Sequence, residues 1–116
     1  MANDDFDDRW LNAVIGREHW HFHKRLFERY GIVLAPGEFS RIHKLIVSRR
    51  AYLVDKSREG SIYVFKLNRT HDEFFVMAVG DRVISAWPPI PQVVKKWKAE
   101  KKEVVLERGY QRHYFI

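Results

Sequence analysis

The spacing of apolar residues changes near Arg50, and this change constrains the fold more than any other feature of the chain. Before it, apolar residues recur at helical intervals over residues 6–15, 17–30 and 36–49. After it come four runs rich in β-branched and aromatic residues, separated by turn residues: 51–54, 61–67, 73–79 and 83–87. The pattern predicts an α+β domain in which N-terminal helices pack on one face of an antiparallel sheet of four or more strands.

The run 73–79 is apolar at nearly every position, which is typical of a central strand covered on both faces. The short link at Gly80 and Asp81 predicts a hairpin with 83–87. Prolines then end the sheet, and a lysine-rich segment over 92–102 predicts an exposed helix, followed by a further strand over 103–107. The single domain 1–116 therefore has three parts: helices over about 6–50, a sheet over about 51–87, and a C-terminal helix with a basic tail over 88–116.

Cysteine is absent from the 116 residues, which excludes a disulfide framework, a thiolate zinc site and a cysteine nucleophile. No apolar run reaches the length of about 20 residues that a membrane-spanning helix needs. The first residues are acidic, whereas a signal peptide begins with basic residues. These features predict a cytoplasmic protein without a membrane partner.

The net charge of +6 is unevenly distributed along the chain. Four aspartates, Asp4, Asp5, Asp7 and Asp8, carry −4 within the first eight residues, so residues 9–116 carry +10. A basic body attracts polyanions because binding releases the counterions around their phosphates. We therefore expect RNA as a partner. The alternative is that the charge serves solubility alone.

The segment 21–31 brings residues suited to phosphodiester chemistry onto one helix face. His21, Arg25, Glu28 and Arg29 are spaced at i, i+4, i+7 and i+8. A histidine near its titration point can move a proton to or from a ribose hydroxyl, and an arginine can hold phosphate oxygens through two hydrogen bonds. The alternative is a solvated face on which Glu28 pairs with a neighbouring arginine or lysine.

Three alternating histidines, His19, His21 and His23, raise the question of a metal site. On a helix only His19 and His23 share a face, and such a pair needs further ligands to hold zinc. The sequence has no acidic cluster nearby to supply them. We therefore expect neither a metal nor another cofactor, and interpret these histidines as packed beside aromatic residues.

The order of these motifs resembles a known group of proteins. The helix segment from His21 to Gly31 is followed by a helix, by several strands, and by a last strand that begins at Arg82 and ends at Trp87-Pro88-Pro89. This order is similar to that of small phage and bacterial proteins grouped with the barnase, colicin and RelE type ribonucleases. The resemblance covers roughly residues 20–89, and the extension from Gln92 onward is outside it.

The resemblance implies roles for particular residues. It implies His21 as the general acid or base, Arg25 and Arg29 as phosphate ligands, and Ser85 as a hydroxyl that binds a phosphate oxygen or orients the histidine. Serine stands at residue 85 where the group usually has threonine. Several members of such families have lost catalysis and kept only binding. Two functions follow: a metal-independent endoribonuclease of toxin type, or a non-catalytic modulator that binds RNA or a host or antitoxin protein.

Further basic and aromatic residues complete the predicted RNA surface. They are Lys24 on the helical segment, Lys95 and Lys98 in the C-terminal helix, and Tyr110, Arg112 and His113 in the tail. Rings and cations of this kind suit single-stranded RNA, whose unpaired bases stack on aromatic side chains. Two alternatives stand beside this interpretation. The lysines can serve solubility, and the tail can dock on the sheet through Tyr114, Phe115 and Ile116.

Overall fold

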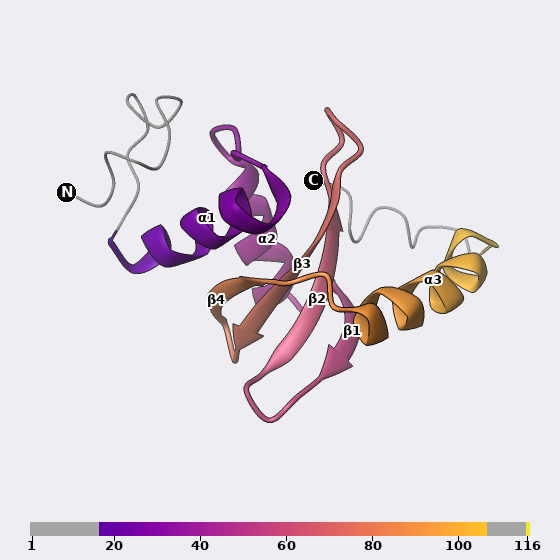
Figure 1. The fold of residues 1–116 in the computed structure, drawn as a ribbon. Coiled ribbons are helices and arrows are strands. Elements are labelled where there is room, and N and C mark those ends of the chain that lie inside the picture. The colour runs from indigo at the N-terminus through magenta and orange to yellow at the C-terminus, as the bar shows by residue number, and fades with distance from the viewer. Residues whose placement is uncertain (1–16, 107–115) are drawn as a thin grey trace.

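The computed structural model describes the backbone of residues 17–106 and 116, and the side chains of residues 19–100 and 116. Two N-terminal helices precede four strands and a final helix (Figure 1). Their bounds are α1 Arg17–Tyr30, α2 Glu38–Val47, β1 Tyr52–Lys56, β2 Ser61–Lys66, β3 Glu73–Val79, β4 Arg82–Trp87 and α3 Pro91–Leu106. The helix predicted over 6–15 lies outside the described residues. No helix within the described part of the chain is long and apolar enough to cross a membrane.

The strands form one antiparallel sheet in the order β1-β2-β3-β4, so each strand pairs with its neighbour in sequence. This arrangement confirms the predicted α+β fold. β3 has a partner on each side, and its residues 74–78 are all buried. Alternate side chains of a strand point to opposite faces. A strand with five consecutive buried residues must therefore be covered on both faces, as its sequence predicted.

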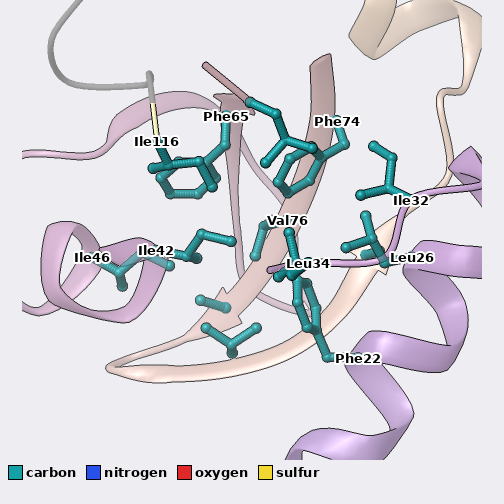
Figure 2. Packing of buried hydrophobic residues seen from close by; sticks show 14 residues of the cluster. Phe22, Leu26, Ile32, Leu34, Ile42, Ile46, Phe65, Phe74, Val76 and Ile116 are labelled. Carbon is teal, nitrogen blue, oxygen red and sulfur yellow. The ribbon is translucent and has the colours of Figure 1, made fainter. Parts of the chain in front are cut away.

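Helices α1 and α2 cover one face of the sheet. Phe22 and Leu26 of α1, and Ile42 and Ile46 of α2, are each four residues apart and lie on the buried side of their helices. They pack with Val76 and the other even-numbered residues of β3 in the larger hydrophobic cluster (Figure 2). The predicted placement of N-terminal helices on one face is confirmed for these two helices.

Helix α3 packs on the other face. The helix predicted over 92–102 is therefore confirmed and the lysines among its described side chains are exposed, but the prediction that the whole helix would be exposed was wrong, because one of its sides is buried. Val93 and Trp97 are buried and pack with Val64 and Phe75 from the sheet. These two residues of α3 are also four apart, so they form an apolar side between the lysines. The sheet face on which Phe75 lies needs a cover, and burial of an indole and several aliphatic side chains stabilises this contact.

The strand predicted over 103–107 was also wrong, because α3 continues to Leu106. Residues 99–106 contain alanine, lysine, glutamate and leucine, which favour a helix, and neither glycine nor proline interrupts them. The two valines in this stretch favour a strand, but this preference is weak. Extending an existing helix by one residue adds a backbone hydrogen bond without a new nucleation step, so the helix continues.

Ile116 lies in the core although it is far from β2 in sequence. Its backbone N–H donates to the Lys66 carbonyl at 2.9 Å, and its carbonyl accepts from the Asn68 N–H at 2.7 Å. The side chain is 3 % exposed and belongs to the cluster under α1 and α2. Docking through Ile116, one of the alternatives for the tail, is therefore confirmed. The other two residues of that alternative, Tyr114 and Phe115, lie outside the described residues.

Candidate nucleic-acid interface

The polar face of α1 carries a local ion pair. Arg25 Nη1 donates to Glu28 Oε1 at 2.8 Å, and both side chains are partly exposed. This is the alternative arrangement expected from the sequence, in which the glutamate neutralises a neighbouring arginine. His21 is exposed on the same helix. An arginine whose charge is matched three residues away attracts a phosphate less than an unpaired arginine does.

Arg29 and Tyr30 attach the end of α1 to the edge strand β4. Arg29 Nη1 donates to the Ala86 carbonyl at 2.6 Å. The Tyr30 hydroxyl donates to the Trp87 carbonyl and accepts from the Phe75 N–H, and burial raises the pKa of Tyr30 to about 12. Arg29 therefore uses part of its hydrogen-bonding capacity inside the protein, although it was predicted as a phosphate ligand.

Ser85 faces away from α1. It pairs with Met77 in the β3–β4 ladder, and Met77 lies on the same face of β3 as Phe75, which packs under α3. The Ser85 side chain is buried, and its hydroxyl donates to the Ala86 carbonyl at 3.4 Å. His21 belongs to the helix that covers the opposite face. The sheet therefore separates the two side chains that the predicted catalytic site requires to meet.

A bulge in the β3–β4 ladder determines this orientation. The register shifts between Met77 and Ala78, so that Val83 and Ala86 both contribute to the cluster under α1 and α2. Strict alternation would have put Val83 and Ser85 on one face. Because of the bulge, Val83 points toward α1 and α2 whereas Ser85 points to the opposite face of the sheet.

His19 and His23 pack against an aromatic ring. Their ring centroids lie 4.4 Å and 5.2 Å from that of Phe39. Burial, and to a smaller extent the neighbouring His19, lower the pKa of His23 to about 4. His23 is therefore neutral at physiological pH. In the part of the chain that is described, no third histidine, aspartate or glutamate joins the pair to form a metal-binding group.

An exposed cationic surface occurs instead on α2 and the segment that follows it. The exposed side chains are Arg41, Lys44, Arg49 and Arg50, with His43 among them, and we call these five residues the α2 surface. Its four permanently charged side chains make no ion pair with any of the residues whose side chains are described. Residues 39–54 contain neither aspartate nor glutamate. The positive potential of this surface is therefore not neutralised locally.

The nearest acidic residue in the sequence, Glu38, is engaged elsewhere. Its carboxylate is buried and accepts hydrogen bonds from Arg69 Nε at 2.9 Å and Arg69 Nη2 at 3.0 Å. It also accepts from the Ala35 N–H at 2.6 Å, next to the start of α2. The pair joins the β2–β3 loop to the first turn of α2. Because the charges of Glu38 and Arg69 compensate each other, this ion pair does not alter the net positive charge of the α2 surface.

The α2 surface was missed at the level of sequence. The net charge of the whole chain conceals this local excess, because acidic residues elsewhere offset it. A window of residues 39–54, which holds four arginines and lysines and no acid, carries the signal.

The lysines predicted on α3 form a separate cationic area. Lys95 and Lys98 are exposed, whereas Lys96 Nζ pairs with Asp55 Oδ1 at 3.1 Å. Because α3 and α2 cover opposite faces of the sheet, these lysines and the α2 surface cannot contact one flat ligand together. Lys24 is half-buried on α1. The remaining predicted RNA ligands, Tyr110, Arg112 and His113, lie outside the described residues.

Comparison of this chain with protein-family models, with curated proteins and with solved structures finds no match.

Proposed function

We propose that this domain binds RNA through cationic side chains and does not cleave it. The observation that carries this proposal is the α2 surface, where four exposed permanent charges lack acidic partners among the described residues. Such a surface attracts phosphates with little regard to base sequence. The choice of RNA among polyanions rests on the resemblance of the sequence motifs to ribonucleases, and the proposed setting is the cytoplasm.

Cleavage is the less favoured function because its predicted groups do not converge. General acid–base catalysis requires the proton-transferring groups to lie within hydrogen-bond reach of one substrate. His21 and Ser85 belong to opposite sides of the sheet, and Arg25 is paired with Glu28. A single phosphate cannot contact both His21 and Ser85 in this arrangement. The same helix face remains available for binding.

The experiment measures the binding of a labelled RNA that contains a hairpin and unpaired flanks, by fluorescence anisotropy over a range of salt concentrations. We expect log affinity to fall with log salt with a slope of about −3, as four phosphate contacts would give. Gel analysis of the same mixtures should show intact RNA, both for the wild type and for His21→Ala. A chelator should change neither result.

Two outcomes would contradict the proposal. Absence of binding at low salt, or affinity independent of salt, would remove RNA as the ligand. Cleavage by the wild type that is lost in His21→Ala would restore the endoribonuclease, since a general acid or base contributes roughly 100- to 10,000-fold in rate.

A further inference from the structure

The end of α2 contains an arginine in a conformation that normally belongs to glycine. Arg49 has φ 60°, and its N–H donates to the Ile46 carbonyl at 3.1 Å, while the Arg50 N–H donates to the Leu45 carbonyl at 2.9 Å. These two bonds form the Schellman motif that ends many helices. In the same chain, α1 ends with Gly31 at φ 68° in the equivalent position.

A side chain at this position makes the folded state less stable than glycine would. The left-handed conformation brings the Cβ atom close to the backbone, and glycine lacks that atom. The helix dipole favours a cation at this end, but Lys44 and Arg50 already supply positive charge near the same terminus. The arginine at residue 49 is therefore not needed to end the helix, and its side chain remains available for a contact outside the protein.

The surroundings of Arg49 match a phosphate backbone in charge. Its side chain is exposed together with those of Arg41, Lys44 and Arg50, and residues 39–54 contain no acid. Arginine holds phosphate oxygens through two parallel hydrogen bonds, with better directionality than lysine.

We infer that the α2 surface docks on the phosphate backbone of double-stranded RNA and that Arg49 is one of its phosphate ligands. This inference rests on the proposed function and names the form of RNA and the residue that contacts it. Arg41, Lys44 and Arg50 supply further contacts from the same helix and its end.

The described side chains favour a duplex over a single strand. Single-strand binding uses exposed aromatic rings on which unpaired bases stack. Among residues 19–100, every phenylalanine, tyrosine and tryptophan is buried or half-buried, whereas the α2 surface offers cations. A duplex encloses its bases and carries twice the phosphate charge of one strand along its axis. Double-stranded RNA is recognised largely through its shape, its phosphates and its 2′-hydroxyls.

The experiment compares the wild type with Arg49→Gly on a labelled RNA duplex of about 20 base pairs, a length sufficient for one small domain. We expect the variant to melt at the same temperature as the wild type or a few degrees higher, since glycine relieves the strained conformation. Its affinity for the duplex should fall about five- to tenfold, and the salt slope should become less steep by about 1. Arg49→Lys should keep the salt slope.

The matched control is Arg58→Gly, which makes the same change of charge at an exposed position in the β1–β2 turn. Its affinity should stay within about twofold of the wild type, because surface changes away from an interface have small effects. If Arg49→Gly binds as the wild type does, or if both variants lose affinity equally, Arg49 is not a specific ligand.

Competition with unlabelled nucleic acids separates this inference from the proposed function. Preference for single-stranded RNA, or for a DNA duplex, would overturn the inference while RNA binding by the domain remained. Failure of the wild type to bind any RNA would overturn both. Preference for the RNA duplex together with the loss in Arg49→Gly supports both.

Discussion

Protonation of His23 should destabilise the fold as the pH falls below neutrality. The ring is 6 % exposed and lies against Phe22 and Phe39, with centroids 5.4 Å and 5.2 Å away. Burial lowers its pKa to about 4, whereas a histidine in the unfolded chain titrates near pH 6.5. Between these two values the unfolded state binds more protons than the folded state. The stability from a neutral His23 is therefore fully present above about pH 6.5 and is lost as the pH falls toward 4.

The two pKa values give the magnitude of this effect. Between pH 7.5 and pH 5 the free energy of unfolding should decrease by about 2 kcal/mol through His23 alone. The assay is urea denaturation followed by circular dichroism at pH 5, 6 and 7.5. His23→Leu removes the titrating group and places an apolar side chain there. Between pH 7.5 and pH 5 the free energy of unfolding of this variant should therefore decrease by about 2 kcal/mol less than that of the wild type. His43→Gln, which changes an exposed ring on α2, should retain the pH dependence of the wild type.

Parallel pH profiles for the wild type and His23→Leu would refute this reasoning. That result would mean that the ring is solvated or protonated in the folded state. A steeper profile in the His23→Leu variant would also contradict it. The comparison uses differences between pH values within each variant, so a constant effect of leucine on packing does not alter the conclusion.

The remaining predictions concern contacts between distant segments, each measured by chemical denaturation. Trp97→Ala should reduce the free energy of unfolding by about 3–5 kcal/mol, because it empties the core under α3, whereas Lys98→Ala on the exposed side should change it by less than about 0.5 kcal/mol. Ile116→Ala should cost about 2–4 kcal/mol, because the side chain is buried in the cluster under α1 and α2. Arg69→Ala should cost about 1–3 kcal/mol by leaving the buried Glu38 carboxylate without two hydrogen bonds. A cost near zero for the Trp97, Ile116 or Arg69 variant would contradict the corresponding contact.

Local features of the sequence predicted most of the secondary structure. The change of apolar spacing at Arg50 separated helices from strands, and Gly31, which follows the helix predicted over 17–30, has the positive φ with which α1 ends. The uninterrupted apolar run 73–79 identified the strand that is covered on both faces. These signals are reliable because helical and strand periodicity, and the freedom of glycine at positive φ, act within a few residues of the chain.

The candidate site was less predictable, because it depends on which surfaces remain exposed after folding. The sequence placed the histidine and arginines of α1 on one helix face, and that face exists. It left open whether Glu28 pairs with a neighbouring cation such as Arg25, and it did not reveal that Arg29 bonds to the backbone of β4. The acid-free run 39–54 was visible in the sequence. The sequence did not show that Glu38, the acid next to this run, pairs with Arg69 and so leaves the cations of α2 without an acidic partner.

The sequence by itself determined the class of fold and the order of its elements from α1 to β4. Only the tertiary structure decided that α3 covers the second face of the sheet, that Ile116 enters the core, and that Ser85 points away from α1. The physical reason is that these outcomes depend on register and packing between segments far apart in the chain. A single bulge at Ile84, opposite Met77 and Ala78, reverses the direction of Ser85 relative to Val83, and no local preference encodes that reversal.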